Sequence, residues 1–243
     1  MNKFFKFILD LIFPIYCVGC KKEGEWACKD CFNKTKLLCQ YENDMEINVI
    51  KKKNIDNLTY IDDIFYFFDF DNKIISELIH ILKYKYAYDI ARFLAKITYK
   101  DFFEFIFYLE QQFGKFIFIP IPLNKKRLNE RGFNQSEIIL IKLLKIKNKK
   151  QKTKTESLGI IDLVKRVRNT AHQASLSGKD RDNNLKNAFV LNNKIDFLEY
   201  KNFNIILFDD VVTTGNTFDT CAKVLRENGF TNMIIGIAIA GQN

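Results

Sequence analysis

Two adjacent acids and a threonine-rich turn stand together in residues 205–217, IILFDDVVTTGNT. The apolar residues predict a buried strand whose carboxyl end, where open parallel sheets bind ligands, carries Asp209 and Asp210. The turn leads directly into a predicted helix, so free backbone N–H groups and hydroxyls meet at the helix N-terminus. This arrangement favours a phosphate cradle over an ordinary capped helix, because a cap alone needs neither both acids nor three threonines. A nucleoside-triphosphate P-loop is excluded, since the chain has no G-x-x-x-x-G-K-S/T sequence.

Four cysteines form two close pairs near the N-terminus, Cys17-x-x-Cys20 and Cys28-x-x-Cys31. Each pair can form a turn that directs two thiolates at one ion, and two such turns close a tetrahedral site. The spacing is typical of structural zinc and of a reducing compartment rather than a disulfide framework. Because four protein ligands leave no open position, we expect a structural Zn²⁺. Cys39 is expected to be a small buried residue, with a fifth ligand as the alternative.

The segment with the two acids resembles the phosphoribosyl-pyrophosphate loop of type I phosphoribosyltransferases. The resemblance implies that Asp209 and Asp210 hold the ribose 2- and 3-hydroxyls. It also implies that the turn holds the 5-phosphate, through Thr213, Thr214, Gly215, Asn216 and Thr217. In such enzymes pyrophosphate leaves the anomeric carbon through a transition state with oxocarbenium character. Mg²⁺ would bridge the ligand oxygens, with Asp209 or Asp210 reaching it directly or through water.

Residues 120–135, PIPLNKKRLNERGFNQ, resemble the R-x-x-x-R-G-F-N-Q signature of the ComF family of competence proteins. Residues 168–189 and the element His80-x-x-Lys83-Tyr84 fit the same family, in which a zinc module precedes the transferase domain. Arg127 and Arg131 follow a predicted strand end, where the pyrophosphate loop lies in the resembling enzymes. The resemblance therefore assigns the leaving group to both arginines and places Arg131 with Asp209 and Asp210 among the catalytic residues.

Three further arginines, Arg166, Arg168 and Arg181, lie in or beside a polar stretch that we expect to be a mobile loop able to close over the site. Solvated surface charges are the alternative interpretation. No residue identifies an acceptor base, so transfer of the sugar and simple binding of it are both open.

Positive charge is concentrated in one part of the chain. The net charge is +9, yet residues 121–181 alone hold sixteen basic and five acidic residues, a net +11. Such a region favours a phosphate-bearing or nucleic-acid partner over an incidental lysine-rich surface. The resemblance to the ComF family, rather than composition, implies a protein of DNA uptake that binds phosphoribosyl pyrophosphate and single-stranded DNA, with DNA-uptake proteins as further partners. The alternatives are a phosphoribosyltransferase of nucleotide metabolism and a non-catalytic regulator that senses phosphoribosyl pyrophosphate.

Alternation of strands and helices predicts an α/β fold with a mostly parallel sheet. The resemblance implies that this fold is of the type I phosphoribosyltransferase kind and that a small zinc module precedes it. Strands are expected near residues 60–70, 115–123, 159–167, 187–191, 202–210 and 233–241. Helices are expected as a pair within residues 73–103, joined near residues 85–88, then at residues 134–147 and 218–229, with loops at residues 124–133 and 148–155. Gly229 is expected to end the last helix.

The predicted domains are an amphipathic segment with the zinc module at residues 1–45, a linker at 46–58 and a phosphoribosyltransferase-like domain at 59–243. No uninterrupted apolar run approaches the roughly 18 to 20 residues of a membrane span. A signal peptide is disfavoured because Asp10 interrupts the apolar N-terminus. We expect a cytoplasmic protein, with peripheral contact at the inner membrane through the N-terminal segment as an alternative.

Overall fold

The computed structural model describes residues 14–37, 50–85, 88–150, 159–167 and 188–242. Several predictions fall elsewhere and are not addressed by it. These are the amphipathic N-terminal segment before residue 14, Cys39, most of the lysine-rich loop at residues 148–155, and the polar stretch with Arg168 and Arg181.

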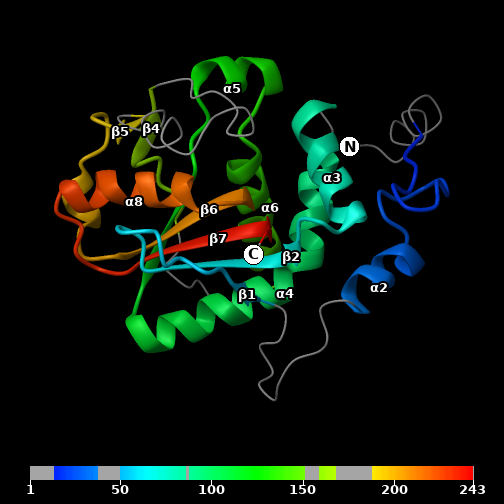
Figure 1. Cartoon of the computed structure of the whole chain (residues 1–243), viewed down its shortest axis with the longest axis horizontal. Helices are drawn as coiled ribbons and strands as arrows, with labels where there is room; N and C mark the ends of the chain where they lie inside the picture. The colour runs from blue at the N-terminus through cyan, green and yellow to red at the C-terminus, as the bar shows by residue number, and fades with distance from the viewer. Residues whose placement is uncertain (1–13, 38–49, 86–87, 151–158, 168–187, 243) are drawn as a thin grey trace.

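A five-stranded sheet forms the centre of the fold, in the order β1-β2-β7-β6-β3 (Figure 1). Four of its strands are parallel neighbours: β2 (Asp63–Asp69), β7 (Ile234–Gly241), β6 (Asn204–Val212) and β3 (Phe116–Pro120). The short β1 (Lys51–Lys52) pairs antiparallel with β2 at one edge. A separate antiparallel pair consists of β4 (Val164–Arg166) and β5 (Phe189–Leu191). The predicted α/β class with a mostly parallel sheet is confirmed.

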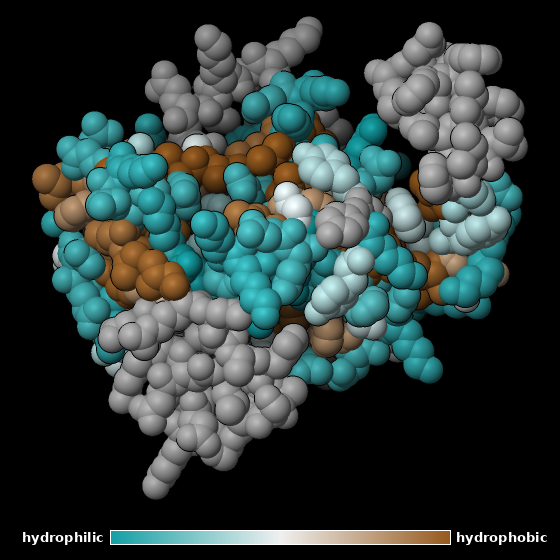
Figure 2. All heavy atoms as spheres, turned by 90° about the horizontal axis from the view of Figure 1, so that it is seen from above, coloured by the Kyte–Doolittle hydropathy of each residue, from teal (hydrophilic) through white to brown (hydrophobic). Residues whose placement is uncertain are grey.

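Helices cover both faces of this sheet, with α8 (Asn216–Glu227) on one side and α4 (Tyr88–Phe113) on the other (Figure 1). Side chains alternate between the two faces along each strand. Phe116 and Phe118 of β3 pack in the core shared with α3 (Lys73–Tyr84), α4 and α6 (Gln135–Lys150). Ile117 and Ile119 of the same strand pack in the core under α8. Both faces are thus apolar, as near-continuous apolar strand sequences require, while the face seen in Figure 2 is largely hydrophilic with smaller hydrophobic patches.

The remaining helices are α2 (Lys29–Leu37), α5 (Lys125–Arg131) and the short 3₁₀ helix η2 (Phe197–Tyr200). The prediction of a loop at residues 124–133 is wrong, because α5 occupies most of it. The Asn124 side chain accepts a hydrogen bond from Arg127 N, and Gly132 ends the helix at φ 74°. Two helices were also predicted too short. α4 continues to Phe113, and α6 includes residues 148–150 of the predicted lysine-rich loop.

Part of the predicted linker is ordered against the sheet. Lys51–Lys52 forms β1, and Ile55 and Leu58 pack against the core under α8. The boundaries of the proposed domains stay a prediction. Among the described residues, no helix has the length and apolar character needed to cross a membrane.

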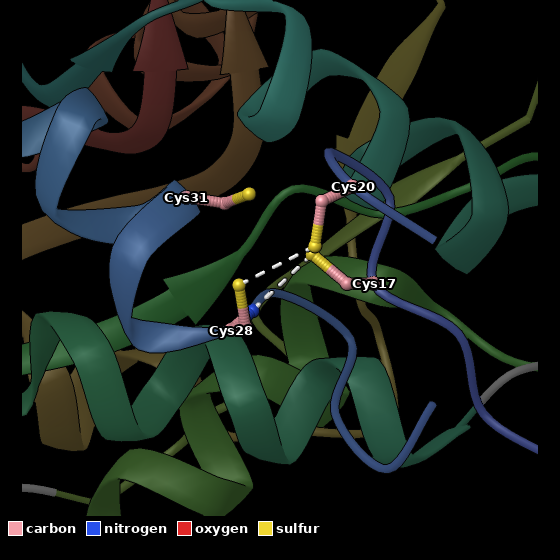
Figure 3. A group of neighbouring side chains, drawn as sticks. All are labelled: Cys17, Cys20, Cys28 and Cys31. Atoms are coloured by element: carbon pink, nitrogen blue, oxygen red, sulfur yellow. Dashed lines mark hydrogen bonds between the residues drawn. The ribbon is translucent and has the colours of Figure 1, made fainter. Parts of the chain in front are cut away.

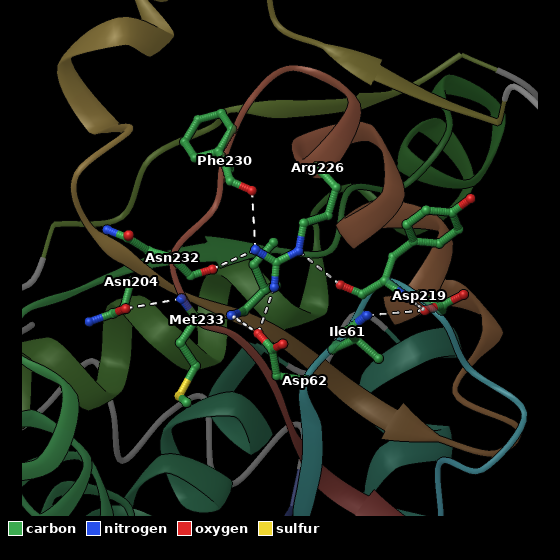
Figure 4. Close-up of polar contacts among 10 residues, drawn as sticks. Ile61, Asp62, Asn204, Asp219, Arg226, Phe230, Asn232 and Met233 are labelled. Atoms are coloured by element: carbon green, nitrogen blue, oxygen red, sulfur yellow. Dashed lines mark hydrogen bonds and ion pairs between the residues drawn. The ribbon is translucent and has the colours of Figure 1, made fainter.

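Arg226, near the end of α8, joins the amino ends of two strands (Figure 4). Its Nη2 lies 2.7 Å from Asp62 Oδ2, which also accepts a hydrogen bond from Ile234 N, the first residue of β7. Nη1 donates to the carbonyl oxygens of Phe230 and Asn232. This network lies at the end of α8 opposite to Gly215, so its role is to fix α8 to the sheet.

Candidate functional site

Asp209 and Asp210 lie in β6 itself, because the strand runs on to Val212 rather than ending at the acids. Asp209 Oδ1 accepts hydrogen bonds from the Ser136 hydroxyl at 2.6 Å and from Asp210 N at 2.8 Å. Asp210 Oδ1 forms an ion pair with Lys83 Nζ at 3.0 Å. Each carboxylate is therefore held by one oxygen, and no donor from the described part of the chain contacts either Oδ2.

Burial, followed by the negative charge of Asp210, raises the pKa of Asp209 to about 7. The hydrogen bond from Ser136 and the charge of Lys83 act in the opposite direction. The carboxyl group of Asp209 thus ionises near neutral pH, because burial and a neighbouring negative charge both disfavour its charged form. A polyhydroxyl ligand or a cation would relieve this repulsion.

The turn after β6 is built around Gly215, the residue before the first turn of α8. Gly215 has φ 84°, a conformation that L residues rarely adopt, and it provides no side chain to cap the helix. A Cβ at this position would lie 2.6 Å from Leu58 Cδ1, so the end of the Leu58 side chain would have to shift. Thr213 and Thr214 are exposed beside the turn, and Thr217 is half-buried. An uncapped helix N-terminus with hydroxyls around it suits an anion.

The predicted arginines lie on α5. Arg131 donates from Nη1 to Gln135 Oε1 at 3.0 Å, and its guanidinium carbon lies 5.4 Å from the centroid of the Tyr84 ring. Arg127 is half-buried. The pKa of Arg166 is lowered first by its own burial and then by the positive charge of Arg127, whereas the negative charge of Asp209 raises it. Arg127, Arg166 and Asp209 therefore share one electrostatic neighbourhood, whereas the described contacts of Arg131 are with Gln135 and Tyr84.

Two residues that hold the acids, Ser136 and Lys83, were not assigned a role from the sequence. Ser136 follows the R-G-F-N-Q segment and stands in the first turn of α6. Buried Asn134 fixes that turn, because its Oδ1 accepts from Ser136 N at 3.1 Å while its Nδ2 donates to Ile121 O. The signal for Ser136 was the capping residue two positions before it. Lys83 belongs to the element His80-x-x-Lys83-Tyr84, but its pairing with Asp210 was not foreseen because that partner lies on a distant strand.

The four predicted cysteine ligands come together, and their sulfur atoms all lie within 4.8 Å of one another (Figure 3). Cys20 Sγ and Cys28 Sγ are 3.6 Å apart. Four thiolates around one Zn²⁺ at about 2.3 Å would be separated by about 3.8 Å, so the cluster fits the size of that ion. A Cβ at Gly19 would lie 2.8 Å from Cys31 Sγ, which explains the glycine between the first two ligands.

The thiols differ in how readily they ionise. Burial of Cys17 opposes ionisation, but hydrogen bonds from the backbone of Cys20, Cys28 and Gly19 lower the pKa of its thiol to about 6. Hydrogen bonds with the other thiols, Cys28 first, raise the pKa of Cys31 to about 12. Four thiolates at this separation need a cation to compensate their charge. The donor set is thus suited to a metal ion.

Sequence comparison places the chain among proteins named for competence and DNA utilization. Competence protein F of Haemophilus influenzae is 39% identical over 114 residues, 46% of this chain and 44% of the relative. DNA utilization protein YhgH of Salmonella typhimurium is 32% identical over 158 residues, 64% of this chain and 62% of the relative. The chain is a homologue of these proteins. The predicted relationship to competence proteins is confirmed.

A third relative, competence protein ComFC of Bacillus subtilis, is 30% identical over 124 residues, 47% of this chain and 40% of that protein. The matches thus cover between about two fifths and three fifths of these relatives' own lengths. No protein-family model matches the chain.

Proposed function

We propose that the protein binds phosphoribosyl pyrophosphate and acts on single-stranded DNA during natural competence. The observation that carries the first part is the pair of acids in β6, each fixed through Oδ1 beside an uncapped helix N-terminus. A ribose diol needs two acceptors at adjacent positions, and a 5-phosphate needs backbone N–H groups and hydroxyls. The two requirements meet at the end of β6.

Each predicted residue has a definite task in this proposal. Asp209 and Asp210 accept hydrogen bonds from the ribose 2- and 3-hydroxyls. The 5-phosphate lies in the turn formed by Thr213, Thr214, Gly215, Asn216 and Thr217. The diphosphate is held by Arg127 and Arg131, which are on one helix, and Arg166 adds positive charge near Arg127. Binding of Mg²⁺ with the ligand is supported by the carboxylate oxygens, which are the ligands this ion prefers.

Transfer of the sugar would break the bond between the anomeric carbon and the diphosphate oxygen and form a bond to an acceptor nucleophile. Asp209, Asp210 and Arg131 are the proposed catalytic residues: the two acids would contact the sugar, and Arg131 would contact the departing anion. A phosphoribosyltransferase of nucleotide metabolism would release pyrophosphate with one defined base. A sensor of phosphoribosyl pyrophosphate would bind the ligand without turnover.

The second part of the proposal rests on charge and on the relatives' names. Basic residues from α5 and α6 contribute much of the +11 in residues 121–181, and positive clefts bind nucleic-acid backbones. The competence and DNA utilization names support a DNA-related role. DNA-uptake proteins are the further partners expected from that role. We place the protein in the cytoplasm, in keeping with cysteines arranged for metal ligation, with peripheral contact at the inner membrane as the alternative.

The proposed architecture is a Zn²⁺ module at residues 1–45, a linker at 46–58 and a ligand-binding domain at 59–243. In the module, Cys17, Cys20, Cys28 and Cys31 hold the ion. α2 begins directly after Cys28 and carries Cys31 in its first turn, so the metal would fix the entry of that helix. The ion would be structural, because four thiolates leave no coordination position for a substrate.

Calorimetric titration with phosphoribosyl pyrophosphate and Mg²⁺ tests the proposal, with and without single-stranded DNA. We expect saturable binding to the wild type and loss of binding in the double variant Asp209→Asn, Asp210→Asn, with zinc content unchanged. A coupling between DNA and the sugar phosphate would favour the competence role over base salvage. Equal binding to wild type and double variant would remove the central assignment. Release of pyrophosphate with one base would favour a transferase of nucleotide metabolism.

A further inference from the structure

Two tyrosines at the junction of α3 and α4 are exposed, although neither is needed for the proposed sugar-phosphate site. Tyr84 is the last residue of α3 and is 53% exposed, and Tyr88 is the first residue of α4 and is 41% exposed. Single exposed rings are normal at a protein surface, so only the groups around them can point to a partner.

Each of the two rings has a cation beside it. Arg131 Cζ lies 5.4 Å from the Tyr84 centroid, and Lys142 Nζ lies 4.2 Å from the Tyr88 centroid. Tyr88 also meets Phe133 edge to face, with centroids 5.7 Å apart. Arg131 and Phe133 are two residues apart, so both tyrosines border the same turn between α5 and α6. The two rings and two cations therefore form one surface, which we call the tyrosine–cation surface.

Cations also lie over the rings of Tyr60, Phe103, Phe189 and Phe197, but those rings are buried or half-buried. Tyr108, further along α4, is 46% exposed, and no described contact brings a cation over its ring. Among the described residues, an exposed ring with a cation beside it is thus found at Tyr84 and Tyr88. A purely apolar partner would not match it, because the cations would lose water without gaining a counter-charge.

The tyrosine–cation surface adjoins the proposed sugar-phosphate site through two residues. Lys83, directly before Tyr84, turns inward and pairs with Asp210. Arg131, beside Tyr84, belongs to the helix that also carries Arg127. In the last turn of α3, Lys83 thus holds Asp210 of the site, and the next residue, Tyr84, presents an exposed ring.

We propose that Tyr84 and Tyr88, with Arg131 and Lys142, bind single-stranded nucleic acid by stacking on its bases and contacting its phosphates. The inference rests on the DNA part of the proposed function and assigns it a surface. Bases present flat aromatic faces regardless of sequence, and phosphates match the two cations. In duplex DNA the base faces are covered by neighbouring pairs, so the surface selects single strands.

Fluorescence anisotropy with three labelled probes tests this surface: a short oligothymidylate, an abasic oligonucleotide of the same length, and a duplex. The test variant is Tyr84→Ala with Tyr88→Ala, and Tyr108→Ala is the matched control, with similar exposure on α4 but no cation. We expect the double variant to bind oligothymidylate at least about tenfold more weakly, since each stacked base contributes substantially. Its affinity for the abasic strand should equal that of the wild type, and Tyr108→Ala should change neither.

A second variant separates stacking from folding. Tyr84→Phe with Tyr88→Phe keeps both rings and should retain wild-type affinity, with unfolding temperatures of all variants compared by circular dichroism. Equal loss for the abasic and the base-bearing strands, or no loss in the alanine variant, overturns the inference. A wild type that binds no single strand overturns both this inference and the DNA part of the proposed function. Titration of the same protein with phosphoribosyl pyrophosphate tests the sugar-phosphate part separately.

Discussion

Lys83 Nζ lies 3.0 Å from Asp210 Oδ1, and both side chains are largely withdrawn from water, at 20% and 7% exposure. The ion pair connects the last turn of α3 with β6, and it is matched by the hydrogen bond from Ser136 to Asp209 Oδ1. One donor from a helix thus holds each acid. The consequence is that the orientation of both carboxylates is fixed before any ligand arrives.

Replacing Lys83 by methionine should weaken binding of ribose 5-phosphate. Asp210 would keep its charge without a partner and lose its fixed orientation, and we expect about 2 kcal/mol of lost stability as well. If Asp210 contacts the ribose diol, affinity for ribose 5-phosphate should fall more than affinity for 2-deoxyribose 5-phosphate, measured by calorimetry. Lys85→Met, at an exposed position of the same segment, is the control and should change neither. Equal losses for both sugars would mean that Lys83 only supports the fold.

The stability of the ligand-free protein should depend on the ionisation of Asp209. In the folded state its pKa is raised to about 7, against an ordinary value of 3.8. Between these values the folded state binds more protons than the unfolded state, so the free energy of unfolding should fall as the pH rises from about 4 to about 7. Urea denaturation without added Mg²⁺ at several pH values measures this slope. Asp209→Asn should flatten the dependence of the free energy of unfolding on pH, whereas Asp56→Asn, at an exposed site, should leave it unchanged. A wild-type free energy of unfolding that rises with pH over this range contradicts the raised pKa.

Substitution of Gly215 by alanine should damage both stability and ligand binding. The residue has φ 84°, and the added Cβ would meet Leu58 Cδ1 at 2.6 Å, so the loss should exceed the 1–3 kcal/mol or so expected for backbone strain alone. Gly114→Ala is a matched control, because φ there is 88° but the nearest atom to a Cβ is 4.0 Å away. Thermal denaturation compares the two variants. Adding Leu58→Ala to Gly215→Ala should restore part of the stability, and a failure to do so would show that the contact with Leu58 is not the cause.

The cysteine cluster should contain one zinc ion per chain in elemental analysis of the purified protein. Cys17→Ser removes a buried ligand and should lower both the zinc content and the stability of the N-terminal region, because metal binding and folding are coupled. Cys221→Ala, in the core under α8 and far along the chain from the cluster, should keep the full zinc content. Gly19→Ala should also weaken metal retention, since its Cβ would press on Cys31 Sγ. Purified wild type free of any transition metal would contradict the assignment.

Sequence reasoning worked best where a feature is built from neighbouring residues. β6, the turn at Gly215 and α8 follow one another along the chain, and the predicted strand and helix are confirmed within a few residues. Gly229 follows the end of α8 at φ 85°, as predicted for a terminating glycine. α5 was missed although Asn124 and Gly132 flank it with capping signals, because the two prolines before it favoured a loop.

The sequence by itself determined the features that depend on local geometry. Cysteine pairs with two residues between them bring their own thiolates together in a turn, and alternating strands and helices predict a mostly parallel sheet. Only the tertiary structure decided which groups hold the acids and which rings stay exposed. Lys83 and Ser136 reach Asp210 and Asp209 from other elements, and Tyr84 receives Arg131 from α5. Burial and electrostatic pairing between such distant residues depend on how helices pack around the sheet, and no local pattern of residues encodes that packing.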